Sequence, residues 1–252
     1  MSYLRYYGRL ARQASYSIAK GVALPLFRHE AMRSGAHEMA YPIATYAPWK
    51  ADAEFDRVYR AIRQNTFVDV WRCHELWSLV GELQAIPGAI LEVGVWRGGT
   101  GSLLAARAKG LGLEETVYLC DTWRGVVKTG DVDTYYRDGK HDDTSRSIVE
   151  RLVAEMGLEN VELLEGIFPE ETGDRIAGES FRLCHCDVDV YQSAKDVLEW
   201  VWPRLSPGGA VVFDDYGFPA CPGVTKLVDE QRMQDDRLVL HNLNGHGILV
   251  KR

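Results

Sequence analysis

The sequence lacks both an excess of positive charge and a long hydrophobic run. Its 36 acidic side chains outnumber the 29 lysines and arginines, for a formal net charge of −7, whereas proteins that grip nucleic-acid phosphates usually carry a basic face. No apolar run reaches the roughly 18 residues needed to cross a bilayer, and residues 1–26 lack the continuous apolar stretch of a signal peptide. We therefore expect no nucleic-acid partner, no membrane anchor and a cytoplasmic location.

Cysteine is also scarce, and no two cysteines have the CxxC spacing of a metal or redox motif. The five form an odd set, several of them inside apolar segments, so we expect buried free thiols in a reducing compartment. Cys184-His185-Cys186 lies in a segment of strand character, where alternate residues share a face. Its cysteines therefore fit small core residues, a zinc site is not favoured, and His185 is expected to be a satisfied buried histidine.

Segments of strand and helix character alternate from residue 66 onward, and the chain ends in two short strands joined by Asn242-Leu-Asn-Gly245. Such alternation predicts a doubly wound α/β fold, and the short last connection predicts an antiparallel hairpin. The expected strands are 89–94, 116–120, 161–164, 181–186, 210–213, 238–241 and 247–251, which form a seven-stranded, mostly parallel sheet.

Helical spacing fills the intervals between these strands. A capping box at Thr66-x-x-Asp69 is expected to open one helix, which Pro87-Gly88 ends, and the turn Ser206-Pro-Gly-Gly209 is expected to stop another. The other helices are expected at 51–63, 102–109, 144–156, 169–176, 191–205 and 224–233.

Residues 1–65 form the part of the chain that is hardest to assign. Their basic, tyrosine-rich start and scattered prolines fit either a helical arm that packs on the domain or a partner subunit, or a lid over the substrate. A swapped arm would make the protein a homo-oligomer, a dimer or larger. We place the domain boundary at 65/66.

Two carboxylate pairs end consecutive apolar strands, Asp187-Val-Asp189 and Asp214-Asp215. In a parallel sheet the carboxyl ends of neighbouring strands meet beside the crevice where such sheets bind ligands. Four carboxylates gathered there require a cation, a proton or both.

A glycine turn follows the first expected strand. Glu92-Val-Gly94 breaks into Val95-Trp-Arg-Gly98-Gly99-Thr100 before a helix, an arrangement that places backbone amides against a ligand. Its spacing departs from the G-x-G-x-x-G of nicotinamide dehydrogenases. Asp121, at the end of the next strand, stands where such folds hold ribose hydroxyls. Glu92 is a second acidic candidate, or else a strand carboxylate bonded to neighbouring backbone.

A long polar segment, residues 122–143, carries Trp123, Tyr135, Tyr136 and His141. Loops of this length inside a compact domain are usually functional or disordered. Its aromatic side chains either line an acceptor pocket or lie exposed on the loop, and His141 is a candidate base.

Taken together, these motifs resemble those of the macrocin O-methyltransferase family, within the class I S-adenosylmethionine-dependent methyltransferases. Residues 87–99 resemble its S-adenosylmethionine motif and 121–125 its second motif, while 187–193, 205–209 and 214–216 match its catalytic half in order and spacing. The resemblance covers residues 66–252. It implies an O-methyltransferase acting on a sugar hydroxyl of a natural-product glycoside or other glycoconjugate.

The resemblance also implies roles for individual residues. The S-adenosylmethionine site would involve Glu92, Gly94, Val95, Trp96, Gly98, Thr100, Asp121, Thr122, Trp123 and Asp187. A divalent cation would bind Asp187, Asp214 and Asp215, which leaves Asp189 as the candidate base with His141 as its rival. Two departures from the family pattern are Val188, where members often have glycine, and the lack of an aromatic residue near Val250.

Oxygen ligands suit magnesium or manganese better than zinc, and a bound cation polarises a hydroxyl and lowers its pKa. Asp189 would then accept the proton; alternatively, it only caps the helix that begins near Tyr191. Two other functions remain open at this point: a catechol-type phenolic O-methyltransferase, and a non-catalytic cofactor-binding protein of the same fold.

Overall fold

The computed structural model describes residue 37, residues 44–242 and residues 244–252. One compact unit runs from Thr45 to Arg252. The arm or lid expected at the N-terminus lies, as far as residue 43, outside the described residues apart from residue 37.

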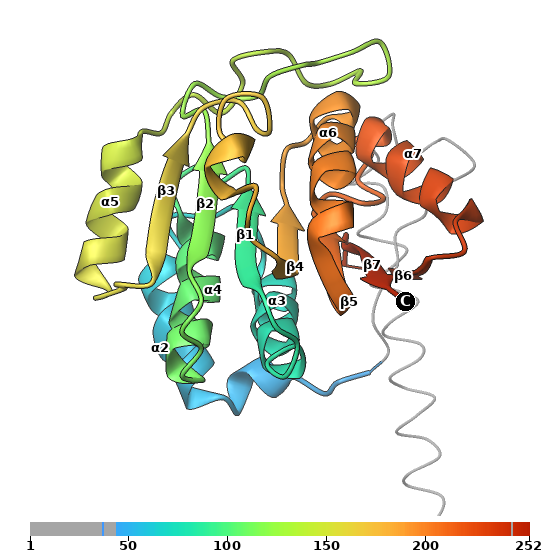
Figure 1. Cartoon of the computed structure of the whole chain (residues 1–252). Coiled ribbons are helices and arrows are strands. Elements are labelled where there is room, and N and C mark those ends of the chain that lie inside the picture. The colour runs from blue at the N-terminus through green and yellow to red at the C-terminus, as the bar shows by residue number, and fades with distance from the viewer. Residues whose placement is uncertain (1–36, 38–43, 243) are drawn as a thin grey trace, which may run out of the picture. The chain divides into compact units, whose positions relative to one another are not determined.

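A single seven-stranded sheet forms the centre of the unit, with the strand order β3-β2-β1-β4-β5-β7-β6 (Figure 1). β1 to β5 run parallel to one another, whereas β7 is antiparallel to both β5 and β6. The predicted doubly wound sheet with a C-terminal antiparallel hairpin is therefore confirmed. The strands are β1 (Ala89–Val93), β2 (Val117–Asp121), β3 (Val161–Glu165), β4 (Phe181–Cys186), β5 (Leu205–Phe213), β6 (Arg237–His241) and β7 (Gly247–Lys251).

Helices cover both faces of the sheet because the buried strands are apolar on both sides. One face packs against α2 (Ala53–Ile62), α3 (Val70–Glu82), α4 (Gly99–Gly110) and α5 (Arg146–Glu155), and the other against α6 (Tyr191–Val201) and α7 (Pro222–Glu230). Short 3-10 turns lie at Pro48–Lys50, Gly173–Ile176, Trp202–Arg204 and Gln231–Met233. Phe55, Val58 and Ile62 of α2 are buried in the same core as α3 and α4.

The start of α3 differs from the prediction. Asp69 is its N-cap, and one carboxylate oxygen accepts hydrogen bonds from the backbone N–H groups of Trp71 and Arg72. Thr66 Oγ1 accepts instead from the N–H of Val68, which closes a local turn before the helix. The capping-box prediction was therefore wrong, since Thr66 does not cap the helix.

The turn predicted at residues 206–209 was also wrong, because these residues lie inside β5. Phe181 of β4 pairs with Leu205, and Leu183 pairs with Ala210, so the residues between them bulge out of the ladder. Gly208 has φ +82°, a conformation that glycine adopts readily. The preceding helix ends at Val201, and the predicted helix 169–176 keeps only its last turn as a 3-10 helix.

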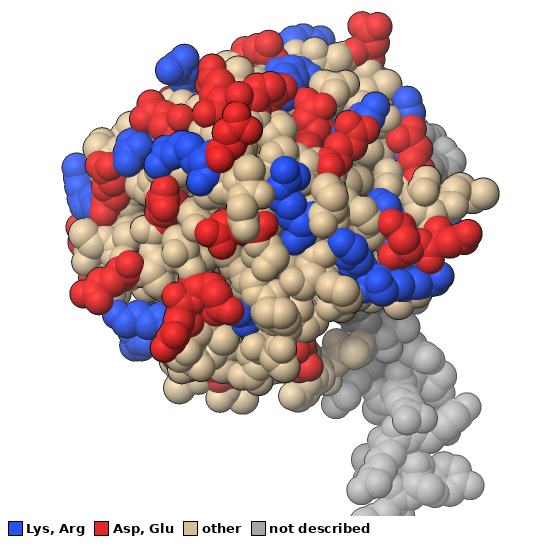
Figure 2. All heavy atoms as spheres, in the orientation of Figure 1, with Lys and Arg blue, Asp and Glu red and all other residues tan. Residues whose placement is uncertain are grey.

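None of the described helices is long and apolar enough to cross a membrane. On the face shown in Figure 2, acidic and basic side chains are interspersed. That face therefore lacks an extended positively charged surface of the kind that attracts a polyanion.

Candidate active site

A cavity of about 250 Å³ opens at the carboxyl ends of β1, β2, β4 and β5. It brings together most of the residues predicted from separate motifs, namely Gly94, Val95, Trp96, Thr100, Asp121, Thr122, His141, Asp187, Asp189, Asp214 and Asp215. Glu92, Gly98 and Trp123 are not among its lining residues. Strand-end positions thus converge at one crevice, as the topology requires.

Gly94 allows the ends of β1 and β4 to approach closely. Its φ is +91°, and a Cβ atom placed there would lie 1.7 Å from the carbonyl oxygen of Asp187. Because a Cβ atom cannot lie so close to a carbonyl oxygen, only glycine is compatible with this position beside the Asp187 backbone. The glycine turn therefore packs directly against the backbone of Asp187.

Asp121 braces the glycine turn. One of its oxygens accepts the backbone N–H groups of Val95 (2.7 Å) and Trp96 (2.8 Å), and the other accepts that of Trp123 (2.6 Å). Burial nevertheless raises the pKa of Asp121, and these hydrogen bonds only partly offset it. Asp121 consequently lines the cavity and holds two of its loops in place.

Glu92 lies below this region, inside the sheet face covered by α3 and α4. It is fully buried, and one carboxylate oxygen is 2.9 Å from Nδ1 of His185. The other oxygen faces Gly101 of α4, where a Cβ would approach to 2.5 Å. Its partner is thus a side chain of the neighbouring strand rather than backbone.

Three carboxylates form a compact cluster at the cavity wall. Asp187, Asp214 and Asp215 each place an oxygen within 4.8 Å of the others. Burial, followed by the charge of Asp214, raises the pKa of Asp187, and burial with the charges of Asp214 and Asp187 raises that of Asp215. The crowding of negative charge makes this a favourable place for a cation or a proton.

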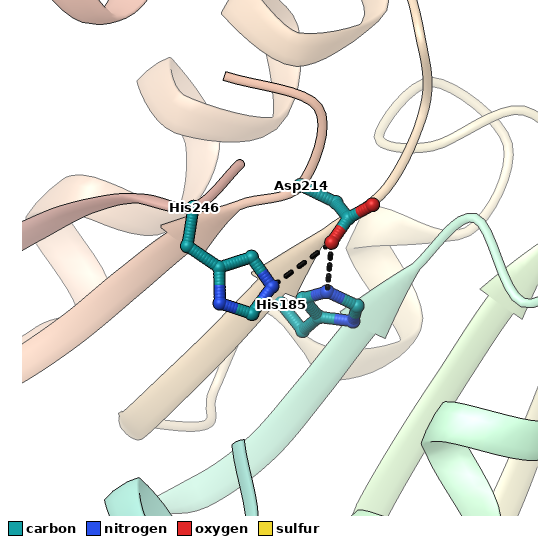
Figure 3. Close-up of side chains that lie close together, drawn as sticks. All are labelled: His185, Asp214 and His246. Atoms are coloured by element: carbon teal, nitrogen blue, oxygen red, sulfur yellow. Dashed lines mark hydrogen bonds and ion pairs between the residues drawn. The ribbon is translucent and has the colours of Figure 1, made fainter. Parts of the chain in front are cut away.

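Asp214 is held by positively charged or donating groups (Figure 3). One oxygen pairs with Arg72, and the other accepts a hydrogen bond from His246 Nε2 at 2.9 Å and lies 3.8 Å from His185 Nε2. Burial acts to raise the pKa of Asp214, but His185, His246 and Arg72 hold it well below its usual range. Conversely, although burial lowers it, the carboxylates of Asp214 and Glu92 raise the pKa of His185 to about 10.

Asp189 and Asp215 both adopt left-handed backbone conformations, with φ +64° each. Such conformations are rare for residues other than glycine and cluster at functional sites. Asp189 does not cap α6: the N-cap residue is Val190, and the N–H of Tyr191 donates to Asp133 Oδ1 at 3.1 Å. The alternative role of Asp189 as a helix cap was therefore wrong, and burial raises its pKa.

Asp133 fixes the long loop 122–143 onto the domain. Its side chain is 2% exposed, and its second oxygen accepts the N–H of Gly130 at 3.0 Å. With the loop anchored in this way, Tyr136 and His141 line the cavity, whereas Tyr135 is 56% exposed. Of the two interpretations of the loop aromatics, lining of a pocket thus applies to Tyr136 and exposure on the loop applies to Tyr135.

Sequence reasoning missed the segment that leads into α3. Cavity-lining residues that it did not identify are Asn65, Thr66, Phe67, Val68, Arg72, Gly166, Phe168, Ser193 and Val197. Arg72 carries no local signal, because an arginine in an amphipathic helix ordinarily faces solvent. All five cysteines are buried and free, as predicted, and His185 is buried.

The sheet order, the antiparallel β7 and the cavity at the strand ends define a class I methyltransferase fold. The structure is similar to that of the O-methyltransferase NovP, with a TM-score of 0.66 and 25% identity over 74% of this chain and 82% of that one. The calicheamicin methyltransferase CalS11 shares the fold, with a TM-score of 0.61 and 18% identity over 84% of this chain and 98% of that one.

The family follows from the sequence comparison. Residues 64–245 match the model described as Macrocin-O-methyltransferase (TylF), and the chain belongs to this family. It is accordingly an S-adenosylmethionine-dependent O-methyltransferase.

Curated relatives share about a third of their aligned residues with this chain. The mycinamicin III 3''-O-methyltransferase of Micromonospora griseorubida is 34% identical over 179 residues, 66% of this chain and 69% of that enzyme. The demethyldecarbamoylnovobiocin O-methyltransferase of Streptomyces niveus is 30% identical over 185 residues, 68% of this chain and 69% of that enzyme. A tetracenomycin rhamnosyl 4'-O-methyltransferase of Streptomyces olivaceus is 33% identical over 169 residues, 62% of this chain and 64% of that enzyme.

Proposed function

We propose that this protein transfers the methyl group of S-adenosylmethionine to a sugar hydroxyl of a natural-product glycoside, with the help of a divalent cation. The observation that carries the proposal is the Asp187, Asp214 and Asp215 cluster, which lies beside the glycine turn in one cavity. The relatives named above for mycinamicin and for a rhamnosyl tetracenomycin support a glycoside as the acceptor.

The cofactor would lie along the glycine turn. Gly94, Val95 and Trp96 present backbone at the cavity wall, and Thr100 lies in the first turn of α4, whose N-terminal end favours a carboxylate such as that of the methionyl group. Asp121 and Thr122 would hold the ribose, and Glu92, Gly98 and Trp123 would act by shaping these loops. Asp187 would lie where the cofactor and the acceptor meet.

The carboxylate cluster fits a hard divalent cation. All three ligand atoms would be oxygens, which suit magnesium or manganese. Burial, together with the neighbouring negative charges, raises the pKa of Asp187 and Asp215, and a cation would relieve the repulsion among these charges. When bound, the cation would polarise the acceptor hydroxyl and lower its pKa. The three aspartates would fix the position of the cation.

Asp189 would accept the proton of the hydroxyl. Its side chain lines the same cavity as the cluster, and burial raises its pKa toward the range in which a carboxylate works as a base. His141 lines the cavity as well and is the competing base.

An assay of the full chain with glycosides that carry vicinal hydroxyls, and with catechols, tests the proposal. EDTA is expected to abolish methylation of the glycoside, and Mg²⁺ or Mn²⁺ is expected to restore it. Turnover of catechols alone would refute the sugar acceptor and favour a phenolic O-methyltransferase.

Full activity in EDTA would refute the cation while leaving the acceptor open. As a control, calorimetric binding of S-adenosylhomocysteine should persist in EDTA, since the glycine turn and Asp121 are not among the proposed ligands of the cation. Asp215→Asn should abolish the response to Mg²⁺ without preventing cofactor binding.

A further inference from the structure

A row of alternating carboxylates and imidazoles, buried except for its partly exposed last member, runs behind the cavity. Glu92 contacts His185 Nδ1 at 2.9 Å, and His185 Nε2 lies 3.8 Å from Asp214. The same Asp214 oxygen accepts from His246 Nε2 at 2.9 Å, and the Nδ1 of His246 contacts Glu75 of α3. Figure 3 shows both imidazoles directed at one oxygen of Asp214.

His246 lies outside the cavity. It directly precedes β7, has no exposed surface and is not among the cavity-lining residues. It therefore touches neither the space for the cofactor nor that for the acceptor. If His246 influences the reaction, it must do so through its contact with Asp214.

Glu75 holds the orientation of the His246 ring. It contacts Nδ1 of His246, and it also accepts a hydrogen bond from the Asn242 side-chain amide. Both ring nitrogens thus face carboxylate oxygens, which fixes the plane of the imidazole. The hairpin turn is tied to α3 through the same carboxylate.

Arg72 and His246 each occupy one oxygen of Asp214. The oxygen that accepts from His246 also faces His185 Nε2, whereas a carboxylate oxygen has two lone pairs, so the oxygen paired with Arg72 retains one for a cation beside Asp187 and Asp215. Carboxylates that bind metals are commonly oriented by outer hydrogen-bond partners of this kind.

We propose that His246, supported by Glu75, is a positioning residue that orients the Asp214 carboxylate for divalent-cation binding. This inference rests on the cation of the proposed function. A purely structural His246 would only tie the C-terminal hairpin to α3.

Manganese binding to the full chain, without cofactor or acceptor, separates these roles. The dissociation constant of Mn²⁺, measured by electron paramagnetic resonance, is expected to rise about 10- to 100-fold in His246→Ala. His246→Gln retains a donor toward Asp214 and should recover most of the affinity. Glu75→Ala should raise the constant less than His246→Ala does, because it acts one contact further away.

Asn244→Ala is the matched control, since Asn244 is an exposed residue of the same hairpin turn, and it should bind Mn²⁺ as the wild type does. S-adenosylhomocysteine affinity should be unchanged in all variants. An unchanged Mn²⁺ constant in folded His246→Ala, or in folded Glu75→Ala if the first variant does not fold, would overturn the inference. Absence of Mn²⁺ binding to the wild type would instead refute the cation itself, and the inference with it.

Discussion

Asp214 differs from the carboxylates around it in its partners. Arg72, His246 and His185 surround it and keep it ionised, whereas Asp187 and Asp215 are buried close to its charge without equivalent donors. One ionised carboxylate beside two others that repel it produces a strong local demand for positive charge. This asymmetry is a property of side-chain contacts and leads to two predictions at the scale of residues.

Asp189→Asn is expected to lower kcat by about 10²- to 10⁴-fold, because the amide cannot accept the proton of the hydroxyl. Cofactor affinity should stay close to that of the wild type, which calorimetry with S-adenosylhomocysteine would check. Asp131→Asn, a change at an exposed position of the 122–143 loop, is the control. If His141→Ala loses activity instead while Asp189→Asn keeps it, the base is His141.

Arg72→Met should destabilise the fold by about 3–5 kcal/mol, because it leaves Asp214 buried without its ion-pair partner. The Arg72 side chain is only 7% exposed and also lies 5.0 Å from the centre of the Phe218 ring. Urea unfolding measures the change. Arg60→Met, which breaks an exposed pair with Asp56, should cost at most about 1 kcal/mol, and similar losses in both variants would contradict the prediction.

At the scale of elements, the connections between strands and helices set the shape of the cavity. The turn from β1 to α4 is held by Asp121, and the loop 122–143 is held by Asp133. The segment before α3 adds a third wall, with Phe67 stacked on Trp96 at a ring-centre distance of 4.1 Å. Each wall thus depends on a contact between elements that are separate in the sequence.

Gly94→Ala tests the close approach of β1 to β4. The added Cβ would overlap the Asp187 backbone, so we expect a loss of stability above the roughly 1–2 kcal/mol that a left-handed alanine costs and at least about a tenfold weaker affinity for S-adenosylhomocysteine.

Gly112→Ala measures the loss of stability that positive φ alone causes, because Gly112 also has positive φ but nothing within 4 Å of its Cβ position. Thermal unfolding and calorimetry of both variants provide the comparison. Equal losses of stability in the two would show that the contact with Asp187 does not matter.

At the scale of the whole molecule, β6 is an edge strand of the sheet formed by the described residues. Leu238 and Leu240 on this strand are 46% and 52% exposed, and Met233 nearby is 85% exposed. Exposed apolar edge strands favour association with another chain. With the basic, aromatic N-terminal segment as a candidate arm, we expect a homodimer or larger assembly.

Light scattering of the full chain during gel filtration measures the assembly directly. A mass at least twice that of the 28.4 kDa chain is the expected result. Leu240→Lys, which places a charge on the exposed edge, should shift the population toward monomer. A monomeric wild type would remove the basis for a swapped arm.

The order of elements and the strand-end carboxylates could be predicted because their signals are local. Apolar runs mark the strands, and Asp121, Asp187, Asp189, Asp214 and Asp215 directly follow or end them, so topology alone brings these residues to one edge. The same local reasoning failed at residues 206–209, which bulge within β5 because the residues on either side of them, Leu205 and Ala210, pair with β4.

What only the tertiary structure decided is which distant side chains complete the cluster. Arg72 and His246 reach Asp214 from 142 and 32 residues away, and Asp133, 58 residues before Tyr191, accepts the first N–H of α6 in place of Asp189. Such contacts depend on how helices and hairpin pack on the sheet, which no periodic pattern records. The sequence by itself therefore determined where the negative charge gathers, and packing determined which partners hold it there.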